Sequence, residues 1–142
     1  DIALSTDIIV GFPGETEEDV DKTIELVKHV GFDNAFTFEY SKRTGTPAAA
    51  MEDQVTPEKV RYNFDRLLKV VQDTGKAQVA KMTGRTEKVL VEEVNEKDPS
   101  LVTGRTDNNT VVHFPGDASM IGTLQSVSLD KCCGFYFIGK KM

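Results

Sequence analysis

The sequence predicts an α/β segment followed by an all-β segment. The first part contains an apolar run rich in β-branched residues, an amphipathic helical pattern and a second strand pattern, as in a βαβ unit with parallel strands. From Met82 onward, short β-rich runs alternate with turn sequences, which favours a small antiparallel barrel of five strands. We therefore place a domain boundary near residues 80–83 and divide the chain into residues 1–80 and 81–142.

The composition is that of a small globular protein. The 142 residues are 39% hydrophobic and 28% charged, which suits one globular domain or two small ones. No stretch approaches the roughly 20 apolar residues of a membrane span, and no signal-peptide pattern opens the chain. We therefore expect a soluble, cytoplasmic protein without a membrane partner. The chain begins with Asp1 rather than Met and residues 2–10 already resemble a strand, so we expect it to be part of a longer protein.

Charge is unevenly distributed along the chain. Residues 1–80 carry 9 Lys and Arg against 15 Asp and Glu, whereas residues 81–142 carry 8 of each. Neither part has the strong positive charge that usually provides affinity for phosphates, so charge alone predicts neither DNA nor RNA binding. A local basic cluster could still bind RNA.

The predicted βαβ unit begins with a strand over residues 2–10 that ends in Ile8, Ile9 and Val10. Thr16 is a predicted N-cap for a helix over residues 17–30, with Asp19 completing a capping box. The buried face and the end of this helix are marked by Val20, Ile24, Val27 and Gly31. A second strand follows over residues 34–40, with Phe36, Phe38 and Tyr40 on one face.

Two loops are predicted to meet at the carboxyl edge of this sheet. The sequence GFPGE at residues 11–15 joins a strand end to a helix N-terminus, where α/β folds bind cofactors, although a tight turn without a ligand is an equal alternative. Residues 41–56 form a long loop that begins with Ser41, Lys42, Arg43 and Thr44. Arg43 could bind a carboxylate or phosphate, or the loop could be a solvated basic turn.

Thr56 and Pro57 then predict the start of a second helix that runs to about residue 79. Five β-rich runs follow, at residues 86–94, 101–105, 110–114, 122–129 and 133–138.

A basic patch on this β-rich part could contact RNA phosphates. Its candidate residues are Arg105, Lys81, Arg85, Lys88, Lys131, Lys140 and Lys141. Aromatic residues that could stack on bases are Phe114, Phe135, Tyr136 and Phe137, of which strand alternation places about half in the core.

No catalytic constellation is visible in the sequence. The two histidines, His29 and His113, lie in a helix end and an apolar strand, where structural roles are the simpler interpretation, although His113 could instead face the surface or RNA. The adjacent Cys132 and Cys133 lack the spacing of zinc or iron–sulfur ligands, so we predict no metal site within this chain.

Several motifs, in order, resemble the radical-SAM tRNA methylthiotransferases, and they extend over essentially the whole chain. The resemblance lies in TDIIVGFPGETEEDV (6–20), FTFEYSKRTGTPAAAMEDQV (36–55), GRT with VVHFPGD (104–117) and IGTLQSVSL (121–129). It implies that residues 1–80 are the C-terminal part of a radical-SAM partial (β/α) barrel. Residues 81–142 would then be a TRAM domain, a small OB-like barrel that binds RNA. The implied activity is transfer of a methylthio group to isopentenylated adenosine beside the anticodon.

The resemblance also implies site residues and partners. Ile9 and Gly11 match the strand that packs on S-adenosylmethionine, and Ser41 and Arg43 match the loop that borders the same site. Arg105 matches an arginine of the TRAM domain, with Lys81 and Arg85 as further candidates for binding the anticodon stem-loop of tRNA. The chain departs from the family pattern at Asp7 and Gly14, with Glu15 one place late.

The family uses two 4Fe-4S clusters together with S-adenosylmethionine, and the cysteines that hold these clusters are not in this chain. They would lie in an N-terminal cluster domain and a radical-SAM core elsewhere in the same polypeptide, so we expect the chain alone to be inactive. Three alternatives remain at this point. They are a ribosomal-protein aspartate methylthiotransferase, a branch acting on threonylcarbamoyl-adenosine, and an RNA-binding module without chemistry.

Overall fold

The computed structural model describes residues 2–142. They form two compact units, one of residues Ala3–Gly75 and one of Lys76–Met142 together with Ile2. The first unit contains β1 (Ser5–Val10), α1 (Glu17–Val30), β2 (Asn34–Glu39), α2 (Pro47–Ala50) and most of α3 (Pro57–Ala80). The second contains the end of α3, β3 (Thr86–Val94), β4 (Leu101–Thr106), β5 (Val111–Pro115), the short helix η1 (Ala118–Met120), β6 (Leu124–Cys132) and β7 (Tyr136–Lys141).

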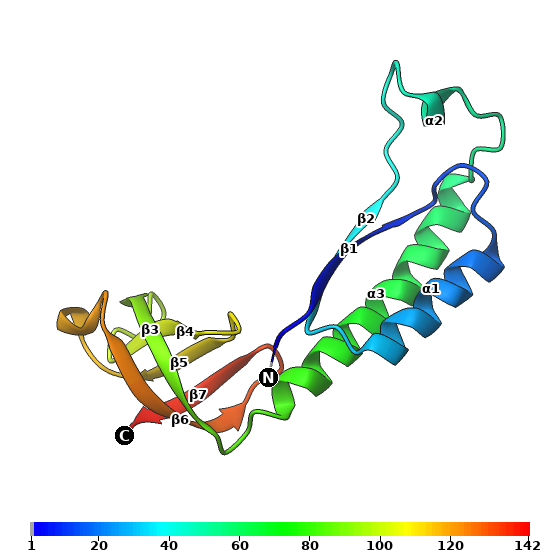
Figure 1. Cartoon of the computed structure of the whole chain (residues 1–142). Helices are drawn as coiled ribbons and strands as arrows, with labels where there is room; N and C mark the ends of the chain where they lie inside the picture. Colours follow the sequence, from blue (N-terminus) through cyan, green and yellow to red (C-terminus); the bar gives the residue numbers. More distant parts are fainter. Residues whose placement is uncertain (1) are drawn as a thin grey trace. The chain divides into compact units, whose positions relative to one another are not determined.

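In the first unit, β1 and β2 form a two-stranded parallel sheet, as the βαβ pattern predicts. Helices α1 and α3 lie side by side along this sheet (Figure 1). Their apolar stripes share a buried cluster with the sheet, made of Val10, Val20, Ile24, Val27 and Leu67. Because both helices cover the same face, no helix or strand within residues 2–142 covers the opposite face of the sheet.

Helix α1 has the limits that its sequence predicts. The Thr16 hydroxyl accepts a hydrogen bond from the Asp19 N–H, and the Asp19 carboxylate accepts one from the Thr16 N–H, which completes the capping box. At the other end, Gly31 adopts a left-handed conformation with φ 70° and its N–H donates to the Val27 carbonyl.

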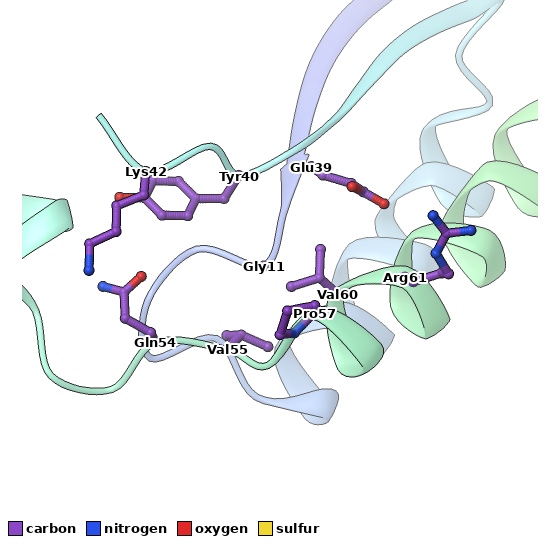
Figure 2. Close-up of a pocket in the computed structure, with 9 residues that line it drawn as sticks. All are labelled: Gly11, Glu39, Tyr40, Lys42, Gln54, Val55, Pro57, Val60 and Arg61. Atoms are coloured by element: carbon purple, nitrogen blue, oxygen red, sulfur yellow. The ribbon is translucent and has the colours of Figure 1, made fainter. Parts of the chain in front are cut away.

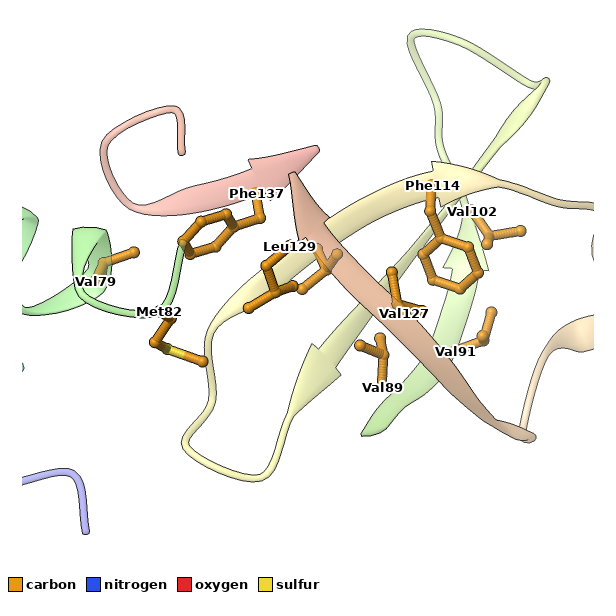
Figure 3. Close-up of a cluster of buried hydrophobic side chains, with 10 residues drawn as sticks. Val79, Met82, Val89, Val91, Val102, Phe114, Val127, Leu129 and Phe137 are labelled. Carbon is orange, nitrogen blue, oxygen red and sulfur yellow. The ribbon is translucent and has the colours of Figure 1, made fainter. Parts of the chain in front are cut away.

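The second unit is a closed barrel with strand order β3-β4-β5-β7-β6. Its core is a continuous row of buried side chains, with Val79 and Met82 at one end and Val102 and Phe114 at the other (Figure 3). The other buried members are Val89, Val91, Val112, Val127, Leu129 and Phe137. Since Val79 belongs to α3, the last turns of that helix are part of the barrel's core.

The barrel corrects one sequence-based expectation. Four of its strand pairs are antiparallel, but β5 and β7 are parallel. Strand directions cannot alternate all the way round a closed ring with an odd number of strands, so at least one neighbouring pair has to be parallel. The all-antiparallel barrel predicted from the sequence is therefore wrong in this respect.

The element limits differ most from the predictions in the first strand and the last two strands. The first strand begins at Ser5 rather than residue 2, and the last two strands extend further along the chain than predicted, to Cys132 and Lys141. The turn between them contains Gly134 with φ 85°, which lets the chain reverse there. The 41–56 loop also contains the short helix α2, capped by Thr46.

Candidate functional site

The uncovered face of the β1–β2 sheet carries exposed apolar side chains. Ile9 pairs in register with Phe38, and both are about half exposed, at 54% and 51%. Phe36 lies on the same face, two residues before Phe38, and is also exposed. In βα barrels the helices cover the outside and the other strand face lines the interior, so this arrangement is typical of a section of such a barrel.

A cavity of about 600 Å³ lies where this apolar face meets the loop after β2. Three of the four predicted cofactor-binding residues, Ile9, Ser41 and Arg43, line it together with Phe12 and Phe38. The Arg43 side chain forms no ion pair or hydrogen bond with any residue in the 2–142 range. The cavity therefore combines apolar and aromatic walls with a guanidinium that is available to an anionic group.

Tyr40 lies at the border of this cavity and was not singled out in the sequence as a candidate. Its ring packs edge-on against Phe12, with ring centroids 5.4 Å apart. Its hydroxyl is buried and has no hydrogen-bond partner among residues 2–142. A buried hydroxyl without a partner is unfavourable, so this atom is a candidate for contact with a bound molecule.

The fourth predicted cofactor residue, Gly11, lies apart from the other three. It lines a separate cavity of about 320 Å³ with residues of the α3 N-terminus (Figure 2). On one side of this cavity Lys42 and Gln54 point toward each other, and Glu39 and Arg61 lie on the other side (Figure 2).

Packing accounts for a glycine at position 11. Its φ is +83°, and a Cβ there would meet the Val60 side chain of α3. Its N–H donates to the Glu15 carboxylate over 2.8 Å. Burial raises the pKa of Glu15, although this hydrogen bond opposes the shift. Contacts within the protein thus explain why Gly11 and Glu15 occur in the GFPGE turn.

The three predicted RNA-binding residues lie around one end of the barrel. Lys81 and Arg85 belong to the turn between α3 and β3, and Arg105 precedes the turn between β4 and β5. These two turns are joined through Met82, whose sulfur accepts from the Asn108 side-chain amide over 3.1 Å and lies 3.7 Å from the Thr110 hydroxyl.

Arg105 is half exposed and already has partners within the barrel. Its Nε donates to the Glu92 carboxylate over 3.2 Å, and its guanidinium also donates to the Asn109 side chain. Lys81 Nζ donates to Gln78 over 2.7 Å. A phosphate that binds here would compete with Glu92 for the Arg105 guanidinium, because both are acceptors of the same donors.

The other aromatic candidates divide into a buried pair and an exposed pair. Phe114 and Phe137 are buried in the core, whereas Phe135 and Tyr136 are exposed. The Lys76 ammonium lies over the Phe135 ring, 5.6 Å from its centroid. The remaining candidate lysines are exposed, namely Lys88, Lys131, Lys140 and Lys141.

Within residues 2–142, no three His, Cys, Asp or Glu side chains come together in a way that could hold a metal ion. None of the helices in this range has the length and apolar composition needed to cross a membrane. Cys132 and Cys133 are both free thiols.

Comparison with known proteins identifies the second unit. The sequence model of the TRAM domain matches residues 80–141, which includes every strand of the barrel.

Relatives match both units at once. The chain is 52% identical to the tRNA-2-methylthio-N(6)-dimethylallyladenosine synthase of Lachnoclostridium phytofermentans over 99% of its own length and 31% of that protein. It is 52% identical to the synthase of the same name from Acetivibrio thermocellus, over 92% of the chain and 27% of the relative. It is 47% identical to that of Clostridium botulinum, over 99% of the chain and 31% of the relative.

The chain thus spans about a third of the length of the curated relatives that it matches. The matched stretch includes both compact units, which agrees with the resemblance seen in the motifs. The chain is therefore similar to these synthases along nearly all of its length, and residues 80–141 match the TRAM domain.

Proposed function

We propose that the chain is part of a methylthiotransferase that modifies isopentenylated adenosine beside the anticodon of tRNA. The observation that carries this proposal is the 52% identity to a synthase of that name over 99% of the chain. The relatives reported above all carry the tRNA-directed name, which favours this branch over a ribosomal-protein aspartate methylthiotransferase. A free-standing RNA-binding module would not account for identity that extends through the α/β unit.

Residues 1–80 would be a section of a radical-SAM (β/α) barrel that contributes one wall of the S-adenosylmethionine site. The apolar face of the β1–β2 sheet supports this, since it resembles the inner face of such a barrel. The cavity beside it would accommodate a nucleoside with a charged tail. Ile9, Phe12 and Phe38 offer apolar surface for a base, and Arg43 offers a partner for a carboxylate.

In this proposal Ile9, Ser41 and Arg43 contact the cofactor, whereas Gly11 shapes the turn beneath it. S-adenosylmethionine would supply the radical chemistry together with two 4Fe-4S clusters whose ligands lie in other regions of the same polypeptide. This chain's residues would bind and orient the cofactor and shield one side of it from water. The chain alone would not transfer a methylthio group.

Residues 81–142 would bind the anticodon stem-loop through phosphate contacts from Arg105, Lys81 and Arg85. Their grouping around two adjoining turns supports this role, because a backbone-binding surface needs cations close together. The formal charge of residues 81–142 is zero, so affinity would depend on this local grouping rather than on net charge.

Titration with an anticodon stem-loop RNA at two salt concentrations tests the RNA role. We expect the chain to bind more weakly at high salt, and Arg105→Ala to lower the affinity and reduce the salt slope by about 1. Lys28→Ala removes one positive charge from the α/β unit and is the matched control. Equal affinities for the two variants and the unaltered chain, with no salt slope, would contradict the proposal.

A chimera tests the enzymatic role. Residues 1–142 would replace the matched third of the Lachnoclostridium phytofermentans synthase, and tRNA nucleosides would be analysed by mass spectrometry. We expect the methylthio adduct on isopentenylated adenosine to form, and Arg43→Ala in the chimera to reduce it. A stable chimera that binds tRNA but forms no adduct would contradict the assignment of residues 1–80.

A further inference from the structure

The outer face of the barrel carries a histidine whose protonation is fixed by its neighbours. His113 lies on β5, and its Nδ1 is 3.2 Å from the Asn95 side-chain nitrogen and 2.9 Å from the Thr103 hydroxyl. The orientation of the Asn95 amide is set from its other end, because its oxygen accepts from the N–H groups of Lys97 and Asp98 over 3.0 and 3.1 Å.

This arrangement determines which ring nitrogen carries the proton. The Asn95 amide nitrogen can only donate, so Nδ1 of His113 has to accept and is therefore unprotonated. The Thr103 hydroxyl can donate to the same nitrogen. The single proton of the neutral imidazole then lies on Nε2, which becomes a hydrogen-bond donor of fixed direction.

The environment of the ring keeps it neutral and leaves Nε2 accessible. Burial lowers the pKa of His113, and the nearby Glu93 carboxylate opposes this only in part. Nε2 has no hydrogen-bond partner among residues 2–142 and is not among the buried polar atoms without a partner, so it reaches solvent.

An exposed aromatic ring lies beside this donor. Tyr136 on β7 contacts His113 edge-to-face, with ring centroids 5.1 Å apart, and is 38% exposed. Arg105, Val111 and Tyr136 pair in register across β4, β5 and β7, so they share the outer face of the barrel. Adjacent strands are about 4.8 Å apart, which places Arg105 roughly 10 Å along this face from Tyr136.

We propose that His113 and Tyr136 form a contact for an unpaired RNA base. The Tyr136 ring supports the base by stacking, and Nε2–H of His113 donates to a carbonyl oxygen or ring nitrogen on the base edge. Arg105 binds the neighbouring phosphate. The proposal rests on the RNA-binding role of the barrel and adds to it a contact that depends on the base rather than on charge.

Two variants and one control, made in the 142-residue chain, test the proposed base contact. His113→Phe keeps an aromatic ring but removes the donor, and Tyr136→Leu removes the stacking surface. His29→Phe makes the same change at an exposed histidine of α1 in the α/β unit. Each protein is titrated with a stem-loop RNA and with an RNA of the same stem whose loop bases are paired, at two salt concentrations.

We expect His113→Phe and Tyr136→Leu each to weaken binding of the stem-loop about tenfold, with little effect on the fully paired RNA and an unchanged salt slope. His29→Phe should bind like the unaltered chain. If His113→Phe binds the stem-loop as well as the unaltered chain does, or if both RNAs lose affinity equally, the base contact is overturned while the RNA role stands. If the unaltered chain binds neither RNA, the RNA role itself fails.

Nitrogen NMR of the unaltered chain provides a test that needs no substitution. The imidazole resonances should show an unprotonated Nδ1 and a protonated Nε2 in the free chain. Addition of the stem-loop should shift the Nε2 resonance while Nδ1 stays unprotonated. A proton on Nδ1, or an Nε2 resonance that does not respond to bound RNA, would overturn the proposal.

Discussion

Gly104 on β4 has no room for a side chain. A Cβ at this position would collide with the Leu90 carbonyl oxygen and the Val89 side chain of β3. The first of these neighbours is backbone in a closed barrel, so it cannot move aside without disturbing the strand pairing. The glycine of the GRT sequence is thus explained by the close approach of two strands.

We therefore predict that Gly104→Ala destabilises the barrel by about 1–3 kcal/mol, the usual cost of overpacking a tight interior. Chemical denaturation followed by far-ultraviolet circular dichroism measures this. Ser126→Ala, on the exposed face of β6, is the control and should change the unfolding free energy by less than about 0.5 kcal/mol. Equal stability of the two variants would refute the steric explanation.

His113 makes stability depend on pH. Its pKa is lowered in the folded state by burial, so below the ordinary pKa of about 6.5 the unfolded chain binds a proton that the folded chain does not. We therefore expect stability to be highest above that pH and to fall as the pH decreases through it toward the lower folded-state pKa. Thermal unfolding of the chain and of His113→Asn at a series of pH values checks this. The variant should lose less stability between pH 7 and pH 5, and identical pH profiles would contradict the prediction.

At the scale of elements, helix α1 depends on its capping box. Thr16→Ala removes the acceptor for the Asp19 N–H and the donor to the Asp19 carboxylate. We expect a loss of about 1 kcal/mol in the unfolding free energy of the α/β unit. Thr23→Ala, within the same helix, is a suitable control, since alanine has the higher helix propensity. If both variants are equally stable, the capping box does not contribute measurably to the unfolding free energy.

Local signals predicted α1 and α3 well but missed α2. Thr46 and Pro47 repeat the Thr-Pro helix start that correctly predicts α3 at Thr56 and Pro57. The helix is a single turn, Pro47–Ala50, so no apolar periodicity follows Pro47 and no second signal indicates a helix there. The shifted limits of β6 and β7 have a different origin, because pairing within the barrel decides where those strands end.

At the scale of the whole molecule, the barrel has a core of its own. Nearly all the residues of that core come from β3 to β7, and Val79 and Met82 complete one end. We predict that residues 76–142 fold alone and reproduce the amide spectrum of the barrel in the full chain. A collapsed or poorly dispersed spectrum would contradict this.

Residues 3–75 should behave differently when isolated. The exposed sheet face of Ile9, Phe36 and Phe38 is an apolar surface without a covering layer. We expect this segment to self-associate as its concentration rises, which sedimentation velocity can measure. Replacing Phe36 with Ser should reduce the association, and a monomer at all concentrations would oppose the expectation.

The sequence by itself determined the order of the long helices and of the strands, the change from an α/β pattern to a β-rich pattern, and the resemblance to the methylthiotransferases. Helix caps, strand alternation and motif order are local properties of the chain, so one sequence is enough to find them. Tertiary structure alone decided which candidates share a site. It brought Ile9, Ser41 and Arg43 to one cavity and Gly11 to another, because Ile9 lies on the exposed face of the sheet whereas the chain at Gly11 turns against Val60 of α3. It also oriented His113 through Asn95 and Thr103, which lie 18 and 10 residues away along the chain. Such contacts depend on barrel closure and strand register, and neither can be read from one segment of sequence.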